Sequence, residues 1–138
     1  MAELRQIYKP IRKEMSKVER QIRAVLRTSD PTLKPIVDFV LASPGKRLRP
    51  ALVLFSAKTG GRNQALAVDL AVTVELIHTA SLVQDDVIDR ADLRRGRQSV
   101  RRVFGNDVSI LFGDYLYSKA FSVLARLNET EVFRSLLE

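Results

Sequence analysis

Three carboxylates crowd the end of an apolar stretch, where Asp85, Asp86 and Asp89 fall within five residues. Residues three, four, seven or eight apart share one face of an α-helix, so His78, Asp85 and Asp89 point the same way, with Asp86 about a quarter turn aside. Carboxylates repel one another, and the negative end of a helix dipole disfavours each anion by ~0.3–1 kcal/mol. Since Mg²⁺ takes carboxylate oxygens as ligands, the cluster predicts a site for divalent cations.

Two arginines, Arg94 and Arg95, follow the acidic cluster almost at once. An arginine side chain binds phosphate and diphosphate groups through two parallel hydrogen bonds. The pair therefore predicts that the other ligand of the metal ions is a phosphate or a diphosphate.

A second basic stretch lies earlier in the chain and reads Gly45-Lys46-Arg47-Leu48-Arg49-Pro50. Glycine lets the backbone approach a ligand closely, and Pro50 is well suited to open a helix. Lys46 and Arg49 would then present two cations at a helix N-terminus, which already favours anions. This stretch predicts a second anion-binding element.

Each feature also has a plain structural interpretation. Acidic residues beside arginines are most often a solvated helix face with weak ion pairs, and a lone histidine such as His78 is more often a hydrogen-bonded core residue than a ligand. The basic stretch has the same alternative as a solvated turn. The combination favours a site, because apolar residues and His78 share the helix of the carboxylates and a basic, glycine-containing stretch follows it.

The composition is that of a soluble globular protein, with 46% apolar and 28% charged residues. At 138 residues the chain fits one domain, 1–138, with a real core. It has no cysteine, which excludes disulfides and thiolate metal sites and predicts a reducing, cytoplasmic location. The charged N-terminus shows no signal peptide, and no apolar run approaches the ~20 residues of a membrane helix.

The net charge of +7 admits three kinds of partner: nucleic acid, an anionic membrane surface, or phosphorylated small molecules. Basic residues cluster at 46–49 and 90–102, on both sides of the acidic cluster, and aromatic residues do not interleave with them. We therefore expect phosphorylated small molecules as ligands and no nucleic acid.

Apolar residues recur at steps of three and four along most of the chain, as is typical of amphipathic helices. The sequence shows no strand pattern, hairpin turn or internal repeat, so the predicted fold class is all-α. We expect 96–105 to be a loop or a broken segment and the third helix to be internal, and Gly113 indicates close packing or room for a ligand. The predicted helices cover 4–27, 32–42, 50–58, 63–89 and 107–127, and a last one begins near 131.

Four segments of the sequence resemble the trans-polyprenyl diphosphate synthases in order and separation. They are GKRLRP at 45–50, DDVID at 85–89, LRRG at 93–96 and GDYLYSKAF at 113–121. The resemblance covers the whole chain and implies the N-terminal half of an isoprenoid-synthase helical bundle. Two residues depart from the family pattern: Pro44 stands where a second glycine is usual, and Gln84 replaces a histidine often found before the paired aspartates. Neither departure removes a charged ligand.

The resemblance implies a head-to-tail condensation of isopentenyl diphosphate with an allylic, farnesyl-type diphosphate. Mg²⁺ would hold the allylic diphosphate, and one arginine would grip it directly. The implied catalytic and metal-binding residues are Asp85 and Asp89, assisted by Asp86, together with Arg94. The implied ligands of isopentenyl diphosphate are Lys46, Arg49, His78 and Arg95.

The product length is predicted from the same helix. The growing tail should run from Asp85 back past Ala80 and Ser81, which are small where short-chain members of the family carry bulky residues. An open tunnel predicts a long-chain product of the octaprenyl, heptaprenyl or solanesyl type, as used for quinone side chains. The alternative is that Ala80 and Ser81 only allow close helix packing.

The resembling proteins are longer and carry a second aspartate-rich motif, which this sequence lacks. We expect the enzyme to need a C-terminal half or a partner chain, as a homodimer or a heteromer, and to have peripheral membrane contact through its product. Three explanations stay open: a truncated chain, a subunit of a split enzyme, or a non-catalytic regulatory subunit. Two further alternatives are a basic phosphate-binding helical module without catalysis and a class I terpene cyclase. The basic stretch at 45–50 and the pair Arg94 and Arg95 argue against the cyclase, which needs no site for isopentenyl diphosphate.

Overall fold

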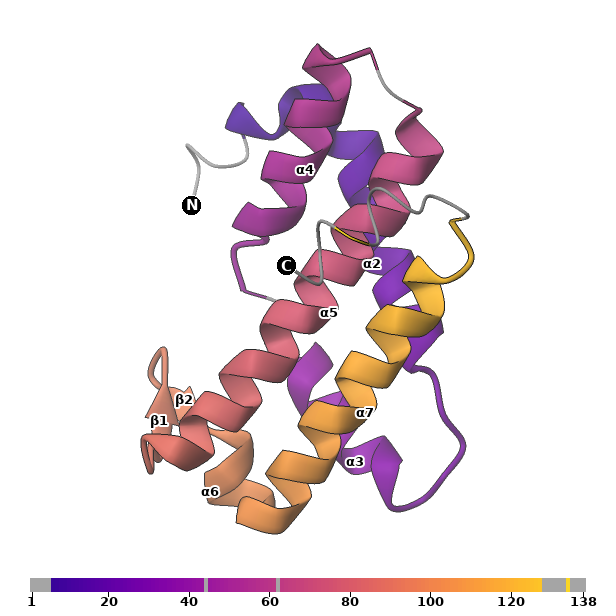
Figure 1. Ribbon diagram of the computed structural model, residues 1–138. Helices are drawn as coiled ribbons and strands as arrows, with labels where there is room; N and C mark the ends of the chain where they lie inside the picture. Colours follow the sequence, from indigo (N-terminus) through magenta and orange to yellow (C-terminus); the bar gives the residue numbers. More distant parts are fainter. Residues whose placement is uncertain (1–5, 44, 62, 128–133, 135–138) are drawn as a thin grey trace.

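The structure is a computed structural model that describes residues 6–43, 45–61, 63–127 and 134. These residues are mostly helical, with one two-stranded antiparallel ribbon (Figure 1). In chain order the elements are the 3₁₀ turn η1 Lys9–Ile11, α2 Arg12–Leu26, α3 Leu33–Leu41, α4 Leu48–Thr59, α5 Gln64–Ile88, β1 Leu93–Arg94, β2 Arg97–Gln98, α6 Val100–Phe104 and α7 Asn106–Leu124.

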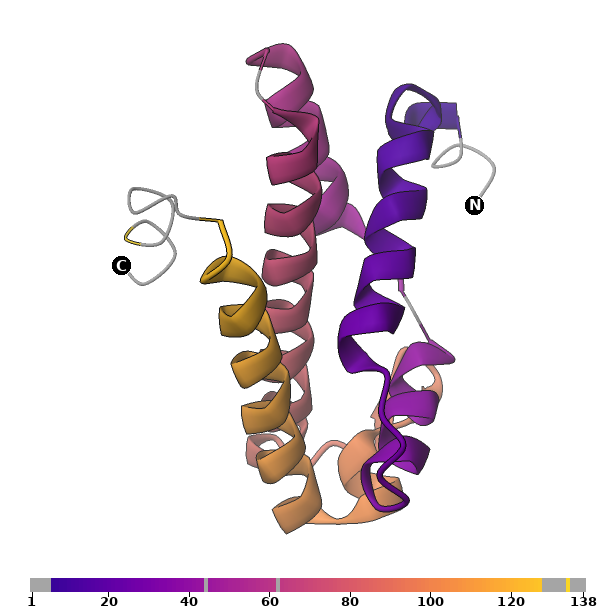
Figure 2. The ribbon, with the colours of Figure 1, turned by 90° about the vertical axis from the view of Figure 1, so that its right-hand side faces the viewer.

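The long helix α5 is the centre of the molecule. It contacts α7, α4 and α2 along its length, and Figure 2 shows it between α7 and α2. The ribbon, α3 and α6 gather near its C-terminal end (Figure 1). Neighbours on several sides explain why α5 is apolar on most of its faces.

α5 is also the one described helix that is long and apolar enough to cross a membrane, by length and composition. The expectation that no segment passes that test is therefore wrong. Glu75 and Asp86 are nonetheless buried in α5 and pair with arginines of this fold. Its apolar character matches its central position among the other helices.

Polar side chains mark where several helices begin. The side chain of Asn63 accepts a hydrogen bond from the Ala65 amide at 2.9 Å and caps α5, a contact typically worth ~1 kcal/mol. Ser99 caps α6 in the same way, accepting from the Arg102 amide at 3.1 Å. Such local signals place α5 within one residue of its predicted bounds, 63–89.

The predicted unbroken helix over 4–27 is wrong at its start. The chain passes through η1, and α2 begins only at Arg12. Pro10 explains the break, because proline lacks the amide hydrogen and clashes with the preceding turn of a helix. The apolar stripe of α2 is buried as expected. The helix predicted to begin near 131 falls almost entirely outside the described residues.

The segment 96–105, predicted to be a loop or a broken segment, holds the short strand β2 and the short helix α6. In the ribbon, Leu93 pairs with Gln98 and Arg94 pairs with Arg97. The two turn residues, Arg95 and Gly96, have φ values of +53° and +76°, the positive sign that a type I′ hairpin turn requires. Sequence reasoning missed the ribbon because such turns favour Asn-Gly or Asp-Gly, and two-residue strands show no alternation.

The expectation that the third helix is internal is wrong for one of its faces. Leu48 and Leu52 of α4 are 51% and 66% exposed, whereas Ala51 and Leu54 are buried. α4 packs against α5, α2 and η1, and its other face carries the two exposed leucines.

Candidate functional site

A cavity of about 470 Å³ lies where α5 faces residues 45–47 and the ribbon. Apolar side chains line part of it, among them Ile22 and Leu26 of α2 and Leu76 of α5. Its remaining wall is polar and charged. The predicted site residues that border it are Lys46, Arg49, His78, Asp86, Arg94 and Arg95. The fold therefore brings together charged residues from three separate stretches of sequence.

Lys46, Arg49 and Arg95 are exposed residues at the cavity. The guanidinium of Arg95 lies against Gly45, which has φ +70°, since a Cβ at this position would fall 2.6 Å from Nη1 of Arg95. The cation of the ribbon therefore lies next to the loop that carries Lys46. Clustered cations of this kind attract and concentrate anionic ligands.

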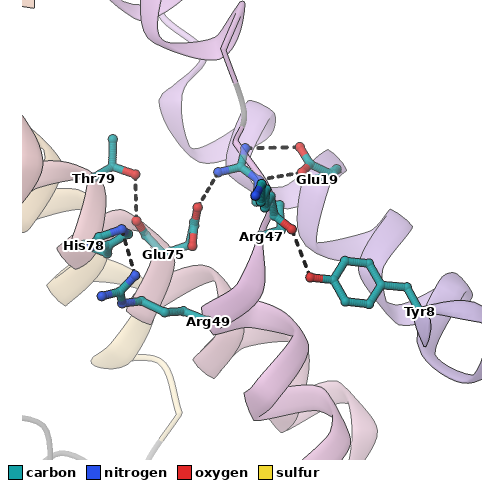
Figure 3. A network of polar contacts seen from close by, with 8 residues as sticks. Tyr8, Glu19, Arg47, Arg49, Glu75, His78 and Thr79 are labelled. Carbon is teal, nitrogen blue, oxygen red and sulfur yellow. Dashed lines mark hydrogen bonds and ion pairs between the residues drawn. The ribbon is translucent and has the colours of Figure 1, made fainter. Parts of the chain in front are cut away.

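His78 is half-buried, and its Nε2 lies 2.9 Å from Nη1 of Arg49 (Figure 3). A guanidinium only donates, so Nε2 accepts and the imidazole carries its proton on Nδ1. Burial lowers the pKa of His78. The charges of Arg49, Arg95 and Arg94 lower this pKa further, against an opposing effect of Asp85. Neutral His78 therefore holds Arg49 without adding another cation to the site.

Asp86 and Arg94 form an ion pair at the end of α5. Nε of Arg94 donates to Oδ1 of Asp86 at 2.8 Å, and Nη2 lies 2.7 Å from the same oxygen. Asp86 is 3% exposed, and its hydrogen bond raises the pKa of Arg94. The structure thus pairs Asp86 with Arg94, and metal binding by Asp86 stays a prediction.

Asp85 and Asp89 are exposed, four residues apart, with Asp89 as the C-cap of α5. Among the described residues, no three His, Cys, Asp or Glu side chains converge as a metal site. Mg²⁺ still fits, because it usually takes one or two carboxylates and completes its coordination with water and substrate phosphates. Two exposed carboxylates near several cations suit a magnesium-bound diphosphate, which carries both signs of charge.

Sequence reasoning missed a buried network centred on Arg47 (Figure 3). Its guanidinium lies 2.6 Å from Glu19 of α2 and 2.7 Å from Glu75 of α5, and 11% of its side chain is exposed. Burial alone would lower the pKa of Arg47, but hydrogen bonds to both carboxylates outweigh it and raise the pKa. The available signal was Glu75, an acidic residue inside an otherwise apolar segment.

Ala80 and Ser81 are predicted to set the product length. In the part of the chain that the structure describes, neither of them lines the cavity. Ala80 is fully buried, one turn before Gln84, which bonds Asp114 of α7. Ser81 is half-buried, and its hydroxyl donates to the carbonyl of His78 at 2.9 Å. Their role along a product tunnel stays a prediction.

Relatives of known name match most of this chain. The polyprenyl synthetase family matches residues 30–138. Octaprenyl diphosphate synthase of Haemophilus influenzae is 37% identical over 119 residues, which cover 86% of this chain and 36% of the relative. Component 2 of the heptaprenyl diphosphate synthase of Bacillus subtilis is 35% identical, over 94% of this chain and 37% of the relative.

A solved structure shares the fold. The crystal structure of a polyprenyl synthase from Caulobacter crescentus, complexed with calcium and isoprenyl diphosphate, matches with a TM-score of 0.91 at 30% identity, over 97% of this chain and 41% of that one. The predicted all-α, isoprenoid-synthase class is thereby confirmed. The chain belongs to the polyprenyl synthetase family. It spans about two fifths of the length of these relatives.

Proposed function

We propose that this protein is a trans-polyprenyl diphosphate synthase, or the portion of one that binds both diphosphates. It would join isopentenyl diphosphate head-to-tail to an allylic diphosphate in a Mg²⁺-dependent reaction. The observation that supports this most is the gathering of Lys46, Arg49 and Arg95 at one cavity, next to the exposed carboxylates at the end of α5. Membership of the family supports the same class of reaction.

The charged residues would have separate roles. Arg94 would contact the diphosphate of the allylic substrate, on which negative charge develops as the C–O bond ionises. Asp85 and Asp89 would hold Mg²⁺, which supplies further neutralisation of this leaving group. The apolar wall of the cavity would exclude water from the allylic cation. The double bond of isopentenyl diphosphate would attack this cation, and loss of a proton would complete the condensation. Isopentenyl diphosphate itself would be held by Lys46, Arg49, His78 and Arg95.

The test of this assignment is magnesium-dependent binding of inorganic diphosphate, measured by isothermal titration calorimetry. We expect Mg²⁺ to strengthen binding and Asp85→Ala to remove that increment. A basic helical module without catalysis would bind through its cations alone, with an affinity that falls steeply with salt. Binding that is indifferent to Mg²⁺ and to Asp85→Ala contradicts the proposal.

The reaction itself is tested by transfer of labelled isopentenyl diphosphate onto farnesyl diphosphate. The assay compares the purified chain with the chain supplemented by an extract of its source. One relative is named as component 2 of a heptaprenyl diphosphate synthase, which supports a heteromer, and a homodimer is the alternative. Activity that appears only in the mixture and disappears with Asp85→Ala would support a partner chain.

A long-chain product for quinone side chains is the finer part of the proposal. Relatives named as octaprenyl and heptaprenyl synthases support it, as do the small residues Ala80 and Ser81. We expect Ser81→Phe to shorten the product, measured by mass spectrometry. Ala80→Phe is a less clean test, because Ala80 is fully buried and a larger side chain there strains the packing. Unchanged product length in Ser81→Phe would contradict the tunnel assignment.

A further inference from the structure

We propose that Arg47 is a positioning residue that sets the geometry of the two cations beside it, Lys46 and Arg49. The inference rests on the proposed function, in which both cations hold isopentenyl diphosphate. The backbone of Arg47 is left-handed, with φ +54° and ψ +37°. A residue other than glycine adopts this conformation against steric resistance, and it persists only where the surroundings hold it.

Two carboxylates from two other helices hold Arg47. Its Nε donates to Oε1 of Glu19 at 2.6 Å and its Nη2 donates to Oε2 at 3.3 Å. Its Nη1 donates to Oε1 of Glu75 at 2.7 Å. These bonds join the start of α4 to α2 and α5 at one point (Figure 3). Moving the guanidinium away would leave a buried carboxylate unpaired, which is strongly disfavoured.

Arg47 points toward Glu19 and Glu75, and only 11% of its side chain is exposed, although it also borders the cavity. Its neighbours Lys46 and Arg49 are exposed at the cavity. The backbone of Lys46 is fixed a second time, since its carbonyl accepts a hydrogen bond from the Tyr8 hydroxyl at 3.0 Å. Two sets of hydrogen bonds therefore hold this part of the chain, one at the carbonyl of Lys46 and one at the side chain of Arg47.

Two parallel contacts then fix α4 against α5. Glu75 and His78 lie one helical turn apart on α5, and they bond Arg47 and Arg49 respectively. The first contact is a buried ion pair, and the second leaves the charge of Arg49 unneutralised. Glu75 and Arg47 thus set the helix spacing at which His78 reaches Arg49.

The charge of Glu75 separates a positioning role from an electrostatic one. A carboxylate near an anion site weakens anion binding through its charge. Glu75→Gln removes this charge, so electrostatics alone predicts equal or tighter anion binding. Loss of position predicts the opposite, because glutamine offers only a neutral acceptor in place of the ion pair, so that Arg47 would fix Lys46 and Arg49 less firmly. The two roles therefore differ in the sign of one measured change.

The experiment measures binding of inorganic diphosphate in EDTA, where affinity depends on the cations and not on Mg²⁺. We expect Glu75→Gln to weaken binding roughly ten- to a hundredfold, as loss of supporting contacts and misplaced groups commonly do. Arg47→Lys keeps the charge without the planar fork and should also weaken binding. The matched control is Asp69→Ala, which removes another α2–α5 contact, the hydrogen bond from Gln21, and should bind like the wild type.

Thermal melts restrict each comparison to temperatures at which the variant is folded. If Glu75→Gln does not fold, Arg47→Lys and Glu19→Gln carry the test, since the Glu19 side chain is 32% exposed. Diphosphate affinity that is unchanged or increased in the folded variants overturns the positioning role. A wild-type protein that binds no diphosphate, with Mg²⁺ or with EDTA, would instead overturn the proposed function. Wild-type binding with unaffected variants removes only the role of Arg47.

Discussion

Two arginines of the site differ in how much of their charge is left for a ligand. Arg94 is paired with the carboxylate of Asp86 at 2.7 Å. Arg49 is bonded by the imidazole of His78, which holds the guanidinium without cancelling its charge. A neutral acceptor is therefore useful beside Arg49, and burial, together with the nearby arginines, keeps His78 neutral by lowering its pKa.

The neutral state of His78 makes the stability of the protein depend on pH. Its folded pKa lies below the ordinary value of 6.5, so the unfolded chain takes up a proton first as the pH falls. The contribution of neutral His78 to the free energy of unfolding is fully present above the unfolded pKa. It is lost as the pH falls through the lowered folded pKa. We expect His78→Gln, which keeps an acceptor for Arg49 but does not titrate, to lose less stability on acidification than the wild type.

The measurement is the urea midpoint of both proteins at about pH 7 and about pH 5, a range that spans the ordinary pKa of histidine. Because the glutamine of His78→Gln does not titrate, the quantity to compare between the two proteins is the change in urea midpoint between the two pH values. Equal losses in the two proteins would contradict a lowered pKa at His78.

Among the elements, the contact between α5 and α7 depends on Gly113. A Cβ on Gly113 would fall 2.7 Å from Cγ of Gln84. In its place, Nε2 of Gln84 donates to Oδ1 of Asp114 at 3.0 Å. Gly113 thus serves close packing, one of the two interpretations that its position in the sequence allowed. Gln84, the residue that departs from the family pattern, occupies the space that this glycine leaves.

Gly113→Ala should therefore change stability in opposite directions in two backgrounds. With Gln84 present, we expect overpacking to destabilise the protein by about 1–3 kcal/mol, more than the ~1 kcal/mol that alanine gains over glycine in a helix. With Gln84→Ala, the obstruction is gone and the helix gain should remain. Urea unfolding of the four proteins gives the coupling energy. A change of the same sign in both backgrounds would refute the steric explanation.

The elements that sequence reasoning predicted well are those with a long periodic signal. The helix predicted over 107–127 is found as Asn106–Leu124, because apolar steps recur over several turns. The ribbon depends on positive φ values at Arg95 and Gly96, and two-residue strands carry no period. The candidate site divides in the same way. The residue types were enough to predict which charged residues belong to the candidate site. The bond between Arg47 and Glu75 could not be predicted, because it joins residues 28 apart in sequence and local patterns do not encode such contacts.

Over the whole molecule, the candidate site is assembled from segments that are distant in sequence. Residues 45–47, the second half of α5 and the ribbon all border one cavity. A ligand that contacts all three would connect them, and a ligand that binds only the folded state stabilises it by mass action. Binding should therefore be visible as thermal stability even without turnover.

We expect Mg²⁺ with inorganic diphosphate to raise the melting temperature. At a hundredfold excess over Kd, the free energy of unfolding should rise by about 2.7 kcal/mol, a shift of roughly ten degrees for a domain of this size. Asp85→Ala should lose the part of the shift that depends on Mg²⁺. Sulfate at matched ionic strength is the control, and an equal shift with sulfate would show only general anion binding by a protein of net charge +7.

At Arg95 in the hairpin turn, we expect the stability of the fold and the affinity for diphosphate to favour different residues. Arg95 has φ +53° in a turn whose first position favours asparagine or glycine. Asparagine tolerates this conformation better, so Arg95→Asn should raise the free energy of unfolding by about 0.5–1 kcal/mol. The same change removes a cation from the cavity and should weaken diphosphate binding. Selection for heat resistance alone would then discard Arg95, and selection for turnover would restore it.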